Sequence, residues 1–131
     1  GISEMIAALD YGRARTGVAI LEGGVSLPVE PVTGGGWERI LSRIGEMKRE
    51  RGLELVILGL PLASGGRPTE LSTEVEALAE VIRSAGVEVL LQPEAGSTKE
   101  VASMPVKHRR RTGRRDSLAA MVILDRYLAE R

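Results

Sequence analysis

Apolar residues occur along the chain in short blocks separated by glycine, proline or polar residues. Blocks of this kind predict strands, because a strand buries four to eight consecutive residues between turns. Five are expected, at Met5–Asp10, Thr16–Leu21, Val25–Val32, Leu53–Leu58 and Val87–Leu91. The fourth reads as a continuous apolar strand, which is typical of a strand buried on both faces. Gly59 and Pro61 are expected to end it.

Other segments repeat their apolar residues at helical spacing. The repeat predicts helices over Trp37–Arg51 and Leu71–Ala85, and a last helix over Asp116–Glu130. In the first two, the apolar positions are Ile40, Leu41, Ile44, Met47, Leu71, Val75, Leu78 and Ile82. Thr73 and Glu76 have the spacing of a capping box in the second helix. The same pattern, Ser97 with Glu100, predicts a short helix that ends before Pro105.

The resulting order, β-β-β-α-β-α-β-α-α, predicts an α/β fold with a mixed five-stranded sheet flanked by helices. Strands joined by short turns should pair antiparallel, and strands joined through helices should be parallel with right-handed crossovers. The 131 residues contain no repeat or linker, so one domain is expected over 1–131. The four residues before Met5 are expected to be a cloning remnant.

Composition removes several kinds of chemistry. The chain has no Cys, so disulfides, thiolate metal sites and Cys nucleophiles are excluded. With no Phe, one Trp and two Tyr, there is little material for an aromatic platform that stacks bases. No apolar run is long enough to span a membrane, and no charged leader precedes the first strand. These features favour a cytoplasmic location.

Charge is unevenly distributed, although 18 basic and 18 acidic residues cancel. The basic segment, Lys107–Arg115, reads KHRRRTGRR and holds six of the Lys and Arg residues. The rest of the chain is therefore net acidic. A single basic segment on an acidic body favours contact with nucleic-acid phosphates, through Lys107, Arg109, Arg110, Arg111, Arg114 and Arg115. The alternative is a solvated or flexible loop.

Three carboxylates fall where the predicted fold brings chain segments together. Asp10 ends the first strand, Glu94 follows the fifth, and Asp116 begins the last helix. Ligands in such sheets bind at the carboxyl ends of the parallel strands. Three carboxylates gathered there would repel one another unless a cation lay among them, and oxygen ligands favour Mg²⁺ or Mn²⁺. Such ions can activate water for phosphodiester hydrolysis.

Each carboxylate also has an ordinary interpretation. Asp10 could be a turn residue, Asp116 a helix N-cap, and Glu94 a solvated loop residue. The glycines near them, at positions 12, 17 and 59, could supply positive φ angles, leave room for a substrate strand, or serve simple turns. His108, the only imidazole, lies in the basic segment, where a Ser-His-Asp triad is not expected.

Four stretches together resemble a known family. LDYGRARTGVAI, VILGLPL, EAGSTKEVA and RRDSLAAMVILDRYL are similar, in order and spacing, to the YqgF/RuvX family of Holliday-junction-resolvase-like nucleases. The resemblance extends from Met5 to Leu128. It implies a ribonuclease-H-like fold and a bacterial cytoplasmic protein. It also implies a role in maturing the 5′ end of small-subunit ribosomal RNA, or resolvase-like cleavage of branched DNA.

The resemblance implies that Asp10, Glu94 and Asp116 are the catalytic, metal-binding residues, with Mg²⁺ or Mn²⁺ as cofactor. One stretch departs from the family pattern, because Pro93 and Ala95 stand where an Asp and an Arg are usual. The loss of that Arg removes a bidentate phosphate contact. Arg13, Arg15 or the basic segment could replace it. The loop Ala63–Gly66 also differs from the family's usual sequence.

Three functions are compatible with these observations. The leading hypothesis is a metal-dependent nuclease acting on ribosomal precursor RNA or branched DNA. The departures at Pro93 and Ala95 motivate a second, a binding module without catalysis. A third is a sugar-kinase-like or actin-like ATPase, suggested by DYGRARTGVAI; it would need a second domain. An aliphatic helix face could also support a homodimer.

Overall fold

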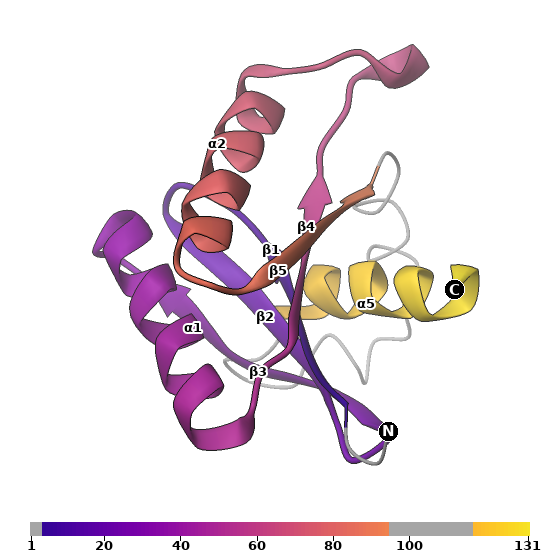
Figure 1. Ribbon diagram of the computed structural model, residues 1–131. Coiled ribbons are helices and arrows are strands. Elements are labelled where there is room, and N and C mark those ends of the chain that lie inside the picture. The colour runs from indigo at the N-terminus through magenta and orange to yellow at the C-terminus, as the bar shows by residue number, and fades with distance from the viewer. Residues whose placement is uncertain (1–3, 95–116) are drawn as a thin grey trace.

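A computed structural model describes residues 4–94 and 117–131 (Figure 1). Within this part the chain forms a sheet with a helix layer on each face. The elements are β1 (Met5–Asp10), β2 (Arg15–Glu22), β3 (Val25–Thr33), α1 (Gly36–Arg51), β4 (Leu55–Leu60), the 3₁₀ turn η1 (Ser64–Gly66), α2 (Glu70–Ser84), β5 (Glu88–Pro93) and α5 (Leu118–Glu130). The short helix predicted from Ser97 lies outside the described residues.

The five strands form one mixed sheet in the order β3-β2-β1-β4-β5. β1, β2 and β3 pair antiparallel, as predicted for consecutive strands joined by turns. β4 pairs parallel with both β1 and β5, as predicted for strands joined through helices. The carboxyl ends of β1, β4 and β5 therefore lie at the same edge of the sheet, which is where the candidate site was expected.

The two faces of the sheet carry separate apolar cores. α1 and α2 pack on the face that includes Met5, Ala7 and Leu9 of β1. α5 packs on the opposite face, against Ile6 and Ala8 (Figure 1). Because side chains alternate along a strand, Asp10 belongs to the α5 face. Of the helices in the described part of the chain, none is long and apolar enough to cross a membrane.

β4 and β5 each begin and end later in the chain than predicted. β4 runs from Leu55 to Leu60, so Gly59 does not end it; the strand stops only before Pro61. The parallel ladder with β5 continues through Gly59 and Leu60. The backbone N–H of Glu94 then donates to the carbonyl of Leu60 at 3.1 Å. Pairing with the neighbouring strand thus outweighs the local turn tendency of glycine.

The capping box of α2 also differs from the prediction. Thr69, not Thr73, is the N-cap: its hydroxyl accepts from the backbone N–H of Ser72 at 3.0 Å, and Ser72 Oγ accepts from the backbone N–H of Thr69 at 2.7 Å. The Thr69 hydroxyl also donates to the carbonyl of Pro61 at 3.2 Å. This contact with the end of β4 favours Thr69 over Thr73, which lies one turn inside the helix.

Candidate functional site

Asp10 is the last residue of β1 and lies partly buried on the α5 face. Burial raises the pKa of its carboxyl group from 3.8 to about 6. Burial is the cause of the raised pKa, and no positively charged side chain among the described residues offsets it. A half-buried carboxylate left in this state is costly, and a bound cation would relieve the cost.

Glu94 follows β5 directly, and its carboxylate lies over Gly59 of β4. A Cβ atom placed on Gly59 would stand 2.7 Å from Glu94 Oε2 and 2.4 Å from Ile123 Cδ1 of α5. Glu94 is only 9% exposed. The missing side chain at Gly59 therefore makes the space that the Glu94 carboxylate fills. The sequence left open a positive φ angle, room for a substrate strand or a simple turn at Gly59; among the described residues it is a protein carboxylate that approaches.

Asp10 and Glu94 converge on one face of the sheet. Leu9 pairs with Leu58, so the next positions, Asp10 and Gly59, are neighbours on adjacent strands. Both positions face α5, and Glu94 covers Gly59. Neighbouring strands are about 4.8 Å apart, so the two acidic groups share one small region. The predicted third ligand, Asp116, and the basic segment lie outside the described residues.

Ser117 attaches the start of α5 to the sheet beside this region. Its side chain is fully buried. The hydroxyl donates to the carbonyl of Val29 in β3 at 2.8 Å and accepts from the N–H of Val18 in β2 at 2.9 Å. The Val18–Val29 pair follows a register shift in the β2–β3 ladder after Thr16. Ser117 thus takes the place of a backbone hydrogen bond at an irregular point of the sheet.

Replacing Ser117 with alanine is expected to lower the free energy of unfolding by about 1–3 kcal/mol, because two buried backbone groups lose their partner. Urea denaturation of parent and variant measures the change. Ser84→Ala is the matched control: the Ser84 hydroxyl donates to the Glu80 carbonyl at an exposed helix end. Its removal should change stability by less than about 0.5 kcal/mol. Equal stability of parent and Ser117→Ala would contradict the bridging role.

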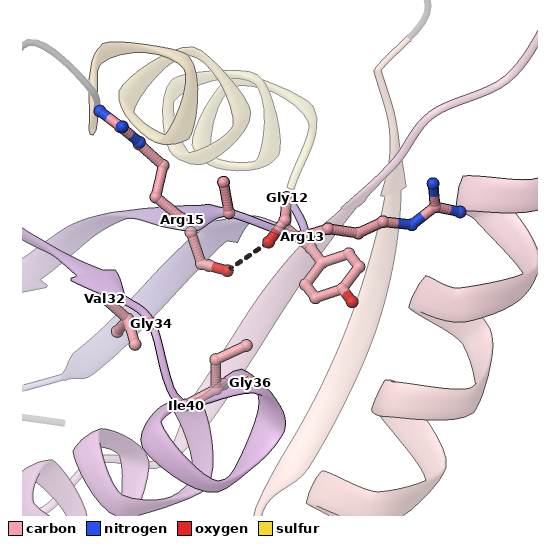
Figure 2. Close-up of a pocket in the computed structure, with 10 residues that line it drawn as sticks. Gly12, Arg13, Arg15, Val32, Gly34, Gly36 and Ile40 are labelled. Atoms are coloured by element: carbon pink, nitrogen blue, oxygen red, sulfur yellow. Dashed lines mark hydrogen bonds between the residues drawn. The ribbon is translucent and has the colours of Figure 1, made fainter.

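Arg13 in the β1–β2 loop and Arg15 at the start of β2 extend in different directions. Figure 2 shows Arg13 reaching toward α2 and Arg15 reaching the opposite way. Both lie on the lining of a shallow cavity formed by the loop and the start of α1. The hydroxyl of Thr16 donates to the carbonyl of Gly12 at 3.5 Å across the loop. Arg13 forms an ion pair with Glu74 of α2.

Sequence reasoning missed a polar chain that joins this loop to both helices of that face. Trp37 Nε1 in α1 donates to the Tyr11 hydroxyl at 3.1 Å, and that hydroxyl donates to Glu74 Oε1 at 3.0 Å. Arg13 Nε donates to Glu74 Oε2 at 2.9 Å. Glu74 lies 61 residues from Arg13 on a helix face that looks merely solvated. No local pattern in the sequence points to it.

The described residues fit a divalent metal in type and position, though they supply only part of a ligand set. Asp10 and Glu94 offer carboxylate oxygens, which Mg²⁺ and Mn²⁺ prefer. Among residues 4–94 and 117–131, no group of three Asp, Glu, His or Cys side chains could hold a metal ion. A third ligand from the rest of the chain, such as the predicted Asp116, would be consistent with this.

Metal affinity should depend on pH through Asp10. With a pKa of about 6, this carboxyl group is protonated below that pH and then cannot bind a cation. The apparent affinity for Mn²⁺ is expected to fall about tenfold per pH unit below 6 and to level off above 7. Titration calorimetry at several pH values measures this. Asp125→Asn, an exposed change on α5, should leave the profile unchanged; a parent profile flat from pH 5 to 7 would contradict the assignment.

Nearly the whole chain is similar to one family of known proteins. Residues 4–130 match the family described as RuvX, Holliday junction resolvase. A Thermus thermophilus protein named "Putative pre-16S rRNA nuclease" is 36% identical, over 95% of this chain and 96% of its own length. A protein of the same name from Chlorobium phaeobacteroides is 32% identical, over 94% and 90%.

Solved structures agree with this at the level of the fold. RuvC of Thermus thermophilus in complex with a Holliday junction substrate superposes with a TM-score of 0.57 and 18% identity, covering 97% of this chain and 96% of RuvC. A second Thermus thermophilus RuvC structure gives 0.58, also at 18% identity, covering 96% of each chain. The predicted ribonuclease-H-like architecture is confirmed.

Proposed function

The chain belongs to the RuvX family, Holliday junction resolvases by description, and we propose that it is a nuclease that processes the precursor of small-subunit ribosomal RNA. One observation carries the proposal: Asp10 and Glu94 share one face at the carboxyl edge of the sheet, with Gly59 making room between strand and helix. This arrangement concentrates acidic oxygens without a protein cation described beside Asp10, which suits a bound metal.

We propose Asp10, Glu94 and Asp116 as the residues that hold Mg²⁺ or Mn²⁺. The bound ion would supply an activated water and stabilise charge on the phosphate. Asp10, partly desolvated, would bind the cation as a fixed carboxylate. Glu94 would bind the same region or orient the attacking water, because its carboxylate lies over Gly59 at the end of β4. The basic segment, with Arg13 and Arg15, would contact the nucleic-acid backbone.

The departure from the family pattern at Pro93 is compatible with this role. Pro93 is the last residue of β5 and pairs with Leu60 in the parallel ladder. Glu94 still reaches its position over Gly59. The proline therefore leaves the carboxylate in the site, and this favours the nuclease over a binding module without catalysis. The curated relatives carry an rRNA nuclease name, which favours RNA over branched DNA as substrate.

The test is cleavage of a labelled small-subunit ribosomal RNA precursor and of a branched DNA, with Mn²⁺, Mg²⁺ or EDTA. We expect metal-dependent cutting of the RNA near its 5′ end and none in EDTA. Preferred cutting of the DNA would replace the RNA substrate with a resolvase activity. Tight binding of either nucleic acid with no cutting in any metal would favour the binding module instead.

A further inference from the structure

Glu74 is a partly exposed acid on α2 that the proposed metal chemistry does not use, and its carboxylate accepts three hydrogen bonds from two residues. Oε2 accepts from the guanidinium of Arg13, and Oε1 accepts from the hydroxyl of Tyr11. The Arg13 hydrogen bond lowers the pKa of Glu74, so this carboxylate stays ionised. Because both carboxylate oxygens are hydrogen-bonded, Glu74 can fix the positions of the side chains that donate to it.

What it holds is the loop that directly follows Asp10. Tyr11 and Arg13 are the first and third residues after that carboxylate, and their bonds to Glu74 cross 63 and 61 residues of sequence. Trp37 of α1 supports the Tyr11 hydroxyl from the other side. The loop is therefore tied to both helices of one face, at the same edge of the sheet as Asp10 and Glu94.

The bonding leaves one edge of Arg13 available. Glu74 is bound through Nε and Nη2, whereas the Nη1 end belongs to a side chain that is 63% exposed. An arginine guanidinium binds a phosphate through two parallel N–H groups. Held side-on by an acid, Arg13 keeps its terminal N–H groups directed outward close to the end of β1, and its rotamer freedom is already reduced.

We propose that Glu74, with Tyr11, is a positioning residue for Arg13, and that Arg13 contacts a backbone phosphate of the nucleic acid beside the metal site. The inference rests on the proposed nuclease function and adds to it the residue that sets the position of one phosphate contact. The alternative is that Glu74 competes with the phosphate for Arg13 and so weakens the contact. The two differ in the sign of the coupling between the residues.

A double-mutant cycle on RNA binding in EDTA measures that sign without cleavage. We expect Arg13→Ala to weaken binding about five- to tenfold and to reduce the slope of log K against log[salt] by about 0.7. In the Glu74→Ala background, Arg13→Ala should weaken binding no more than about twofold, because an unheld arginine contributes less. Glu80→Ala is the matched control: Glu80 pairs with Arg83 on the same helix, and the Arg13 effect should persist there in full.

The fluorescence of Trp37, the only tryptophan, reports whether the polar chain is intact in each variant before RNA is added. An Arg13 effect that is larger without Glu74 would overturn the proposal and make Glu74 a competitor; equal effects in both backgrounds would overturn it as well. If inorganic phosphate displaced the RNA with the same affinity as the RNA itself, Arg13 would belong to a site for free anions, and the proposal would be overturned. Failure of the parent to bind or cut RNA would overturn the proposed function itself, whereas normal cutting without coupling would overturn only this inference.

Discussion

Asp10→Asn is expected to reduce metal-dependent cleavage by at least about 100-fold while making the folded chain more stable. Asparagine keeps the shape of the side chain but removes the charge that would bind the cation. Loss of one ligand from a metal that activates water removes several kcal/mol of transition-state stabilisation, so a large rate effect follows. A change at an ordinary turn residue would instead leave cleavage nearly intact.

The stability gain follows from the pKa of Asp10. In the folded chain that pKa is about 6, above the ordinary 3.8, so the folded state binds this proton more tightly than the unfolded chain does. Deprotonation therefore costs stability as pH rises from 4 to 6, and the full cost is present at pH 7. A neutral Asn avoids it. After allowance for partial solvent screening, the gain at pH 7 is expected to be about 1–2 kcal/mol.

Thermal unfolding with and without Mn²⁺ separates these effects. The parent should be stabilised by the ion, because a ligand that binds only the folded state raises its apparent stability. Asp10→Asn should start from a higher melting temperature in EDTA and gain little from Mn²⁺. Asp125→Asn should respond to Mn²⁺ like the parent. A variant that melts earlier in EDTA, or cuts as well as the parent, would remove Asp10 from the metal site.

The elements that could be predicted from sequence are those in which local pattern and tertiary pairing agree. β1 is confirmed at Met5–Asp10 because its apolar run ends sharply on a charge. β4 was misplaced because Gly59 carries a turn tendency that the ladder with β5 overrides. The N-cap of α2 was misplaced because the local sequence is compatible with a cap at either Thr69 or Thr73. The contact of Thr69 with Pro61, which lies just after β4, decides between them.

The candidate site divides in the same way. The shared position of Asp10 and Glu94 at one edge of the sheet could be predicted because the carboxyl ends of parallel strands lie together, and ligands in such sheets bind there. Glu74 could not, since its bonds to Tyr11 and Arg13 join segments that have no common pattern. The reason for glycine at position 59 was equally hidden: the residue matters for the carboxylate that approaches it from β5, and no spacing within β4 records that.

Gly59→Ala tests whether the space over β4 is needed for catalysis. The added Cβ would stand 2.7 Å from Glu94 Oε2 and 2.4 Å from Ile123 Cδ1, both closer than real contacts allow. Ile123 is fully buried and Glu94 nearly so. We expect a stability loss of about 1–3 kcal/mol from overpacking, and a fall in cleavage of about 100-fold as the Glu94 carboxylate moves.

Two further variants separate the steric effect from the catalytic one. Gly45→Ala adds the same methyl group within α1, where only the flexible end of Arg49 lies near, at 3.3 Å; it should stabilise the helix by about 0.5–1 kcal/mol and leave cleavage unchanged. Ile123→Val removes the Cδ1 atom that Gly59→Ala would strike.

Combined with Gly59→Ala, Ile123→Val should recover part of the lost stability but not the cleavage, because the methyl group still occupies the position of the Glu94 carboxylate. Recovery of both together would mean that Gly59 serves only the packing of α5 on the sheet. Recovery of stability alone would assign the two contacts different roles: Ile123 fixes the helix, and Gly59 fixes the position of Glu94 beside Asp10.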